Sequence, residues 1–224
     1  MIITLSSQVS SNGHLIGKMI AEKLNLQYID NELIAQIAHK LHTEEKIVAR
    51  FDGEFDSEQH EPFLLDWLVS INPENYLRTL RSALFEIVEK DNALIIGRGA
   101  SFILQGRNPI FHIRIMAPIN VRKAIFLAKN EGYTEAEAAK YIKEHEQKRN
   151  KFAEHIFNIK NLDDGSLYDL TLNLAHYTPE MAVDVITMAV TTRFKDGAPI
   201  NSESNTQSLV NLLSKHKKPR GLGF

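Results

Sequence analysis

Short apolar runs alternate with helix-like apolar stripes along most of this chain, and this alternation constrains the fold more than any other feature. A run of about four to eight apolar residues fits a buried strand, whereas apolar residues three and four apart fit one face of a helix. Such alternation predicts a parallel sheet covered by helices on both faces. The expected strands lie near residues 2–5, 26–30, 93–96, 110–115 and 168–174, and the expected helices near 13–24, 31–41, 76–90, 120–130, 134–149 and 180–190.

Length and composition limit the number of domains, the classes of binding partner and the kinds of site that this chain can have. The 224 residues suit one domain with a lid or tail, or two small domains at most, and 43% of them are hydrophobic. The formal net charge of −2 gives no overall attraction to nucleic acid or to a membrane surface. The chain has no cysteine, which excludes disulfides, thiolate metal sites and cysteine nucleophiles. Because it also shows no secretory signal pattern and no membrane-length apolar run, we expect a cytoplasmic protein.

The first expected strand runs into a loop of small polar residues that opens a helix. In a parallel sheet, ligands collect at this edge, and a helix start offers free N–H groups and the positive end of the helix dipole. The loop therefore predicts a site for an anion such as phosphate. The alternative is an ordinary strand-to-helix turn in which Asn12 and Gly13 supply positive φ angles. The small or polar members are Ser6, Ser7, Ser10, Ser11, Asn12 and Gly13.

This loop does not fit the strict Walker pattern G-x-x-x-x-G-K-[ST]. In that pattern the lysine contacts the β- and γ-phosphates and the hydroxyl contacts Mg²⁺. Here the matching stretch is "SSNGHLIGK", in which Gly13 falls at the lysine position and His14 at the Ser/Thr position. The strand, loop and helix are present, but the usual loop cation is missing.

Five separated segments, in order, resemble the cytidylate kinase-like family, a branch of the P-loop nucleoside monophosphate kinases. That family typically opens with "ITISREYGSGGREIGRKLAEKLG" followed by a Tyr-Asp pair, and it too lacks a standard Walker lysine. The resemblance covers roughly residues 1–190. The matching segments here are "ITLSSQVSSNGHLIGKMIAEKLN" followed by "YID", "LIIGRGASFIL", "FHIRIMAP", "KRNKF" and "YDLTLN".

The resemblance implies a three-layer α/β fold of the P-loop nucleoside monophosphate kinase type with a helical lid. It implies a phosphotransferase that moves the γ-phosphoryl group of ATP to a nucleoside monophosphate or another small acceptor, with cytidine monophosphate as the first candidate. The implied cofactors are ATP and Mg²⁺. We therefore expect a nucleotide and a small-molecule acceptor as partners, and neither a membrane nor nucleic acid.

The resemblance also assigns roles to residues. The donor phosphates are expected at the loop residues Ser10, Ser11, Asn12, Gly13 and His14, with backbone amides from Ser11 to His14 as the cradle. Arg98 is expected to hold the acceptor phosphate, Asp30 to orient the acceptor, and Arg149 to reach in from the lid. Further cationic candidates are Arg122, Lys148 and Lys151 in the lid region, and Arg78 and Arg81 outside it. We expect no metal site built from protein ligands alone, because no histidine shows ligand spacing.

Two of these residues have structural alternatives. Arg98 follows a buried strand between two glycines, where it could hold a phosphate through two parallel hydrogen bonds or simply pair with Asp30. Asp30 ends the second strand, and besides orienting an acceptor it could be the N-cap of the helix that starts at residue 31. The sequence leaves both alternatives open.

Departures from the family pattern support a second hypothesis. Ser7 and His14 stand where the family has arginines, and Ser10 and Asn12 replace two loop glycines. Losing one preorganised donor to developing charge costs on the order of 3 kcal/mol in an enzyme site. The alternative to a kinase is therefore a catalytically impaired nucleotide-sensing or partner-binding module on the same fold. A dinucleotide-dependent oxidoreductase fits less well, because no G-x-G-x-x-G follows the first strand.

The composition of the chain changes near residue 193, where a linker-like polar stretch, "KDGAPINSESNTQ", begins. We expect a kinase-like domain over residues 1–192, with a lid at about 131–165, and a linker and C-terminal tail over 193–224. The tail contains the basic stretch "KHKKPRGLGF". Thr43 is expected to cap a further helix, and the acidic stretch 52–73, which contains "FLLDWLV", is expected to pack.

Overall fold

The computed structural model describes residues 1–43, 45, 72–90, 92–107 and 109–195. Its centre is a five-stranded sheet in the order β2-β3-β1-β4-β5, and every neighbouring pair of strands is parallel. This arrangement confirms the predicted fold class. The strands are β1 (Ile2–Ser7), β2 (Gln27–Ile29), β3 (Ala93–Ile96), β4 (Ile110–Met116) and β5 (Leu170–Asn173).

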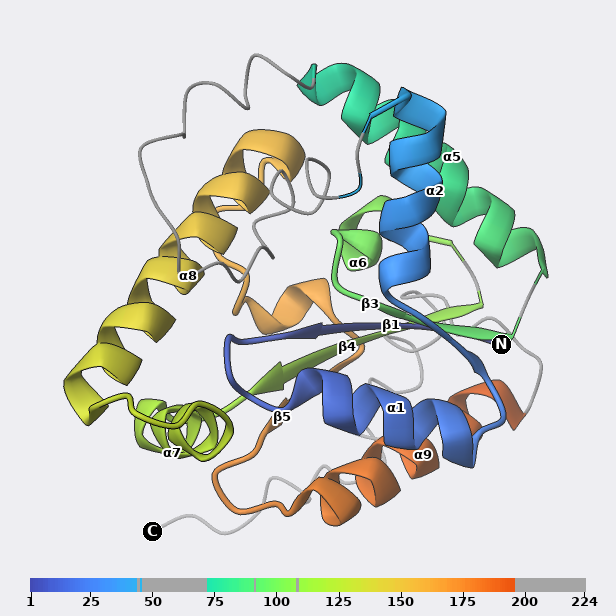
Figure 1. Cartoon of the computed structure of the whole chain (residues 1–224). Helices are drawn as coiled ribbons and strands as arrows, with labels where there is room; N and C mark the ends of the chain where they lie inside the picture. The colour runs from blue at the N-terminus through green and yellow to red at the C-terminus, as the bar shows by residue number, and fades with distance from the viewer. Residues whose placement is uncertain (44, 46–71, 91, 108, 196–224) are drawn as a thin grey trace, which may run out of the picture.

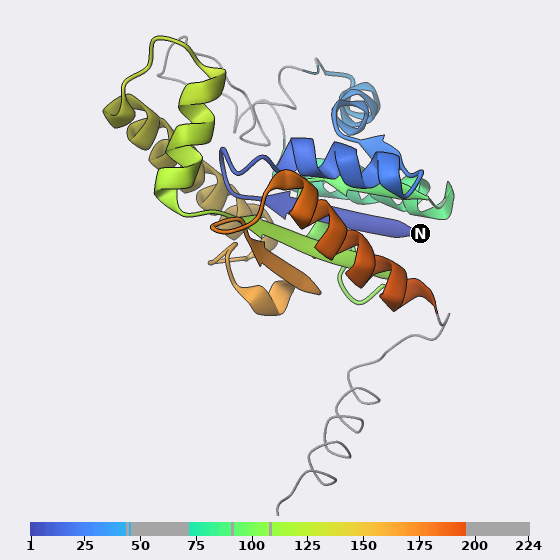
Figure 2. The same ribbon diagram turned by 90° about the horizontal axis from the view of Figure 1, so that it is seen from below.

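Helices cover both faces of the sheet (Figures 1 and 2). The pair α1 (Gly13–Lys23) and α9 (Pro179–Lys195) packs on one face. The other face is covered by α2 (Asn31–Leu41), α5 (Pro73–Lys90) and the short α6 (Ala100–Ile103). Two further helices, α7 (Ile119–Lys129) and α8 (Glu135–Phe157), pack on each other and lie beyond the carboxyl ends of β1 and β4 (Figure 1). A 3₁₀ turn, η1 (Gly165–Leu167), precedes β5.

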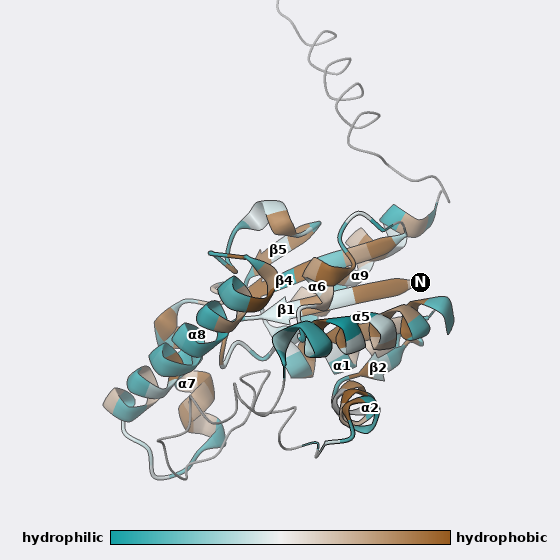
Figure 3. Cartoon of the chain, turned by 90° about the horizontal axis from the view of Figure 1, so that it is seen from above, coloured by the Kyte–Doolittle hydropathy of each residue, from teal (hydrophilic) through white to brown (hydrophobic). Residues whose placement is uncertain are grey.

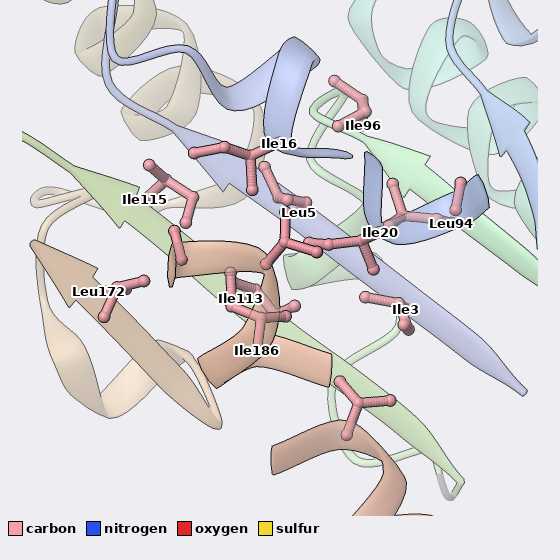
Figure 4. Close-up of a cluster of buried hydrophobic side chains, with 14 of the residues drawn as sticks. Ile3, Leu5, Ile16, Ile20, Leu94, Ile96, Ile113, Ile115, Leu172 and Ile186 are labelled. Atoms are coloured by element: carbon pink, nitrogen blue, oxygen red, sulfur yellow. The ribbon is translucent and has the colours of Figure 1, made fainter. Parts of the chain in front are cut away.

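Side-chain alternation along the strands divides the core into two layers. Ile3 and Leu5 of β1 face α1 and α9, where they meet Ile16, Ile20 and the other side chains drawn in Figure 4. Neighbouring residues on each strand point to the opposite face, because successive side chains alternate. Both faces of the sheet are thus buried, which is why its strands read as continuous apolar runs rather than alternating ones.

The opposite face is less uniformly apolar. Towards its middle, Thr4, Ser101 and His112 are all buried and form a hydrogen-bonded group: the Thr4 hydroxyl lies 2.9 Å from Ser101 Oγ and 2.7 Å from His112 Nδ1. In Figure 3 the strands are mainly brown, whereas much of α8 is teal. Hydrophobic side chains therefore hold the sheet between its helices, and the polar side chains of β1 and β4 concentrate on one face.

Local signals correctly predicted several helix starts. Thr134 and Glu137 form the capping box expected from their spacing: Glu137 N–H donates to Thr134 Oγ1, and Thr134 N–H donates to the Glu137 carboxylate at 2.8 Å. Thr178 accepts from the Met181 amide at 3.3 Å before α9 begins at the expected proline. The prediction ended α8 too early, near residue 149, although the helix continues to Phe157. It also missed α6, which is a single turn.

Some predictions lie outside the described residues. These are the helix capped by Thr43, the packing of the "FLLDWLV" stretch and the structure of the tail beyond residue 195. The boundaries of the lid and of the kinase-like domain remain predictions. Across the described residues, no helix is both long enough and apolar enough to cross a membrane.

Candidate phosphate-transfer site

The sheet order brings the predicted site residues to one edge. β3 lies between β2 and β1, so the segments that follow these strands are neighbours at their carboxyl ends. Asp30 follows β2, Arg98 follows β3 and the polar loop follows β1. β4 continues the row on the other side of β1 and leads into α7. Residues far apart in the sequence therefore meet where ligands of parallel α/β sheets bind.

The loop after β1 turns tightly before it enters α1. Ser10 and Asn12 have φ angles of 59° and 60°, in the left-handed region. Gly13 is already helical, so the alternative that it supplies a positive φ is wrong. Its lack of a side chain matters for another reason: a Cβ at Gly13 would lie 2.2 Å from Ser7 Oγ. Glycine at this position lets the end of β1 and the start of α1 come together.

The first turn of α1 presents its amides at the sheet edge. The helical hydrogen bonds begin with the Ile16 N–H, which donates to the backbone carbonyl of Asn12 at 3.0 Å. The amides of Gly13, His14 and Leu15 therefore come before the first helical hydrogen bond. The Asn12 side chain does not cap the helix, and the first turn contains no acidic residue. These features suit an anion, since the amides and the helix dipole both favour negative charge here.

Ser11 differs from the prediction that its amide helps to cradle phosphate. It is buried, and both its N–H and its hydroxyl donate to the Gln8 carbonyl, at 3.2 and 2.7 Å. Ser11 therefore closes the turn inside the loop rather than facing a ligand. The amides available at the helix start are those of Gly13, His14 and Leu15, so Leu15 replaces Ser11 and Asn12 in the predicted cradle.

His14 and Asp30 lie in contact at the start of α1. His14 Nδ1 is 3.2 Å from Asp30 Oδ2 and 3.1 Å from the Tyr28 hydroxyl. Asp30 occupies the N-cap position of α2, but its side chain makes no capping hydrogen bond. The capping alternative is thus wrong for the carboxylate, which faces the site instead.

The surroundings of Asp30 keep its carboxyl group ionised. Burial by itself would raise its pKa, but the hydrogen bond from His14 and the electrostatic effects of the nearby His14, Arg98 and Lys18 side chains outweigh burial. The pKa of Asp30 therefore lies below its ordinary value of 3.8. At neutral pH this group is an acceptor of hydrogen bonds and a counter-charge for cations.

Arg98 lies in a tight left-handed turn after β3. Gly97, Arg98 and Gly99 have φ angles of 63°, 56° and 66°. A Cβ at Gly99 would lie 2.1 Å from the ring of Phe157, so this turn packs closely against the end of α8. The Arg98 side chain is only 1% exposed, and its Nη2 lies 3.9 Å from Asp30 Oδ1. The ion pair between Arg98 and Asp30, the structural alternative for Arg98, is therefore present as a long contact.

The loop is attached to α7 and α8 by polar and apolar contacts. Val9 N–H donates to Glu146 Oε1 at 2.8 Å, and Arg122 donates to the same oxygen at 2.9 Å. Arg122 also donates to the Ala117 carbonyl at 2.9 Å. The Val9 side chain packs with Phe126 of α7 and with apolar residues of α8. Arg122 thus holds the loop in place, while its charge is offset by Glu146.

Arg149 is the predicted lid cation that reaches the loop. Its Nη1 donates to the Ser7 carbonyl at 3.2 Å. Among the other candidates, Lys148 and Lys151 are exposed on α8, and Arg78 and Arg81 are exposed on α5, where Arg78 donates to Asn75 of its own helix.

Arg114, Asp163 and Gln8, which the sequence analysis left without a role, form a hydrogen-bonded group next to the end of β1. The buried Arg114 of β4 donates to Asp163 Oδ1 at 2.7 Å and to Ser6 at 2.7 Å. Gln8 donates to Asp163 Oδ2 at 2.9 Å and accepts from the Ala117 amide. An arginine inside the apolar strand "IFHIRI" was the sequence signal, since a buried guanidinium needs an anionic partner. Nothing in the local sequence identified Asp163 as that partner.

Among the residues that the structure describes, no three His, Asp or Glu side chains cluster in a way that could hold a metal ion.

Comparisons with known proteins bear on the family and the fold. The family model described as the cytidylate kinase-like family matches residues 2–176, which confirms the resemblance predicted from the five segments. A cytidylate kinase from Methanocaldococcus jannaschii is 28% identical over 193 residues, covering 85% of this chain and 97% of the relative. A cytidylate kinase from Pyrococcus horikoshii is 28% identical over 190 residues, covering 85% of this chain and 88% of the relative.

Solved structures share the fold at lower identity. An uncharacterised protein from Eubacterium ventriosum superposes with a TM-score of 0.64 at 18% identity, covering 85% of this chain and 98% of the other. A shikimate kinase from Bacteroides thetaiotaomicron superposes with a TM-score of 0.51 at 16% identity, again covering 85% and 98%. The architecture is therefore that of P-loop kinases.

Proposed function

Since the chain belongs to the cytidylate kinase-like family, we propose that it transfers the γ-phosphoryl group of ATP to a nucleoside monophosphate, cytidine monophosphate first among them. A nucleotide kinase-like function follows from the family and the fold. The identity of the acceptor, and the claim that the protein catalyses the transfer, are our proposal. The observation that carries it is the meeting of Arg98, Asp30 and the opening of α1 at one edge of the sheet.

The donor would be ATP as its Mg²⁺ complex. The amides of Gly13, His14 and Leu15 are suited to its phosphate oxygens, because they precede the helical ladder at a helix start without acidic residues. Mg²⁺ bound to these phosphates would neutralise part of the charge that develops during transfer. The protein's own contribution is then to hold the polyphosphate in line with the acceptor.

Arg98 and Asp30 would bind the acceptor from the neighbouring strands. The buried guanidinium of Arg98 is suited to two parallel hydrogen bonds with the acceptor phosphate, while ionised Asp30 accepts from an acceptor hydroxyl. An oxygen of the acceptor phosphate forms a new bond to the γ-phosphorus as the bond to the bridging oxygen of ADP breaks. Arg149, which donates a hydrogen bond to the Ser7 carbonyl, would offset part of the negative charge of this transfer.

The experiment is a coupled assay for ADP release with Mg²⁺·ATP and a panel of nucleoside monophosphates, together with calorimetry of each ligand. We expect release of ADP and formation of cytidine diphosphate with cytidine monophosphate. Arg98→Gln should weaken monophosphate binding roughly 10- to 100-fold, because it removes a charge-assisted contact, while ATP binding is retained. The matched control is Arg107→Gln, since Arg107 is an exposed arginine that stacks on Phe85.

Two outcomes would contradict this proposal in different ways. Binding of Mg²⁺·ATP without transfer to any acceptor of the panel would favour the nucleotide-sensing module, which the missing loop cations support. Absence of ATP binding at millimolar concentration would show that the loop has kept only its architecture.

A further inference from the structure

A cation from another part of the fold lies at the loop that lacks its usual lysine. Lys129, the last residue of α7, donates from Nζ to Asn12 Oδ1 at 2.8 Å. Asn12 is the N-cap residue of α1, immediately before the amides of the cradle. We propose that Lys129 supplies the phosphate-binding charge that the Walker lysine supplies in other P-loop proteins. This inference rests on the proposed function, because it assumes that the cradle binds a nucleotide polyphosphate.

The packing of α7 explains why Lys129 reaches the loop. Phe126 is buried in a cluster with Val9 of the loop and with Ala138 and Ile142 of α8. Residues three apart on a helix lie on the same face, so a lysine three positions after Phe126 is directed to the same side as the loop. The hydrophobic contact at Val9 thus fixes the position of α7, and with it the position of the Lys129 ammonium.

The contact with Asn12 has two consequences for a ligand. The side-chain oxygen of Asn12 accepts from Lys129 and does not cap α1, which leaves the first amides of the helix to an anion. The partner of Lys129 is also a neutral amide. Among the described residues, Lys129 forms no salt bridge with an acidic side chain, so its charge is not offset there. A polyphosphate held by the cradle would meet both the amides and this ammonium group.

Two other cations near the loop, Arg122 and Arg149, have different partners. Arg122 is bound to Glu146 and to the Ala117 carbonyl, so a carboxylate already offsets its charge. Arg149 donates to the Ser7 carbonyl at the end of β1, whereas Lys129 donates to the residue that immediately precedes the cradle. Lys129 is exposed, and its long side chain can leave the Asn12 oxygen and move to a phosphate oxygen. Lys129 is therefore suited to contact the donor's outer phosphates.

The test is calorimetry of Mg²⁺·ATP and of AMP with wild-type protein and with Lys129→Met, Lys129→Arg and Lys123→Met. Lys123 is the matched control: it lies three residues before Phe126 on the same helix and pairs with Glu135 at 2.7 Å. We expect Lys129→Met to weaken ATP binding by about tenfold or more and to leave AMP binding almost unchanged. Lys129→Arg should restore most of the ATP affinity, and Lys123→Met should behave as wild type.

The failure of this inference can be told from the failure of the proposed function. If wild-type protein binds Mg²⁺·ATP and Lys129→Met binds it as tightly as Lys123→Met does, Lys129 has no such role and the proposed function stands. If wild-type protein binds no ATP, both fail. Equal losses for ATP and AMP would also overturn the inference, because the lysine would then act on the loop's shape and not on the outer phosphates. Thermal melts followed by circular dichroism verify that each variant is folded.

Discussion

At the scale of single residues, the environment of each polar group decides its chemistry. Asp30 and His112 illustrate this in opposite ways. For Asp30, the effect of burial is outweighed by the hydrogen bond from His14 and by the nearby Arg98 and Lys18, which lower the pKa of its carboxyl group and keep it charged. Burial instead lowers the pKa of His112 below its ordinary value of 6.5, and the nearby Asp169 only partly offsets this. His112 is therefore neutral in the folded protein, and its Nδ1 is bonded to Thr4.

This state of His112 predicts a loss of stability in mild acid. Its pKa is lower in the folded than in the unfolded chain, so the unfolded chain binds more protons below about pH 6.5. Its stabilising contribution is complete above that pH and falls as the pH drops towards the folded pKa. Urea denaturation between pH 7.5 and 5.5 should show this fall, and His112→Asn should reduce the slope by up to about 1.4 kcal/mol per pH unit.

The exposed His155 provides the control for that measurement. His155→Asn should leave the slope of stability against pH as it is in the wild type. If His112→Asn and wild type lose stability in parallel over this range, His112 does not carry the effect.

At the scale of elements, the α7–α8 pair and the loop after β1 form one connected unit. Val9 packs into the apolar cluster between the two helices, and Glu146 of α8 binds both the Val9 amide and Arg122. These contacts join residues 137 positions apart in the sequence. The shape of the phosphate loop therefore depends on the helices beside it as well as on its own residues.

Removal of the Glu146 carboxylate should loosen this unit. Glu146→Ala leaves a half-buried amide and a half-buried guanidinium without their shared acceptor, which we expect to cost about 2 kcal/mol of unfolding free energy. Urea denaturation measures this loss. The neighbouring Glu144→Ala on the same helix should change stability by less than about 0.5 kcal/mol, because its side chain is exposed. Equal effects of the two substitutions would show that Glu146 contributes only as a surface charge.

At the scale of the whole molecule, two apolar layers on either side of a parallel sheet hold the site edge in place. Leu94 of β3 is fully buried in the layer beneath α1 and α9, near Ile20 of α1 (Figure 4). Gly17 of α1 lies close to Ile96 of the same strand, since a Cβ there would lie 2.6 Å from the Ile96 side chain. Close packing between α1 and β3 keeps the amides of α1 beside the Arg98 turn.

Truncation of this central contact should be costly. We expect Leu94→Ala to lower the free energy of unfolding by about 2–5 kcal/mol, because it removes buried methyl groups and leaves a cavity in a rigid layer. Leu15→Ala is the comparison, since Leu15 is 44% exposed and should change the unfolding free energy by less than about 0.5 kcal/mol. Chemical denaturation of both variants measures the difference. Similar stabilities would mean that the core closes around the Leu94 cavity.

The sequence by itself determined the fold class and most of the helices and strands. Apolar spacing identified the five strands and most helices, and the Thr134–Glu137 pair marked a helix start correctly, because these signals act within a few residues of backbone. The same local logic indicated an anion site at the loop and drew attention to Asp30 and Arg98. It failed where two local roles competed, as at Asp30, whose carboxylate could cap a helix or face a ligand.

Only the tertiary structure decided which side chains meet. The strand order β2-β3-β1-β4-β5 differs from the sequence order, so it places Asp30 and Arg98 beside a loop from the start of the chain. The contact between Lys129 and Asn12 spans 117 positions and depends on how α7 packs against Val9. Spacing along the chain carries no information about such a pair. The packing of α7 and α8 beside the loop is the physical reason that Lys129, although distant in sequence, lies at the loop in space.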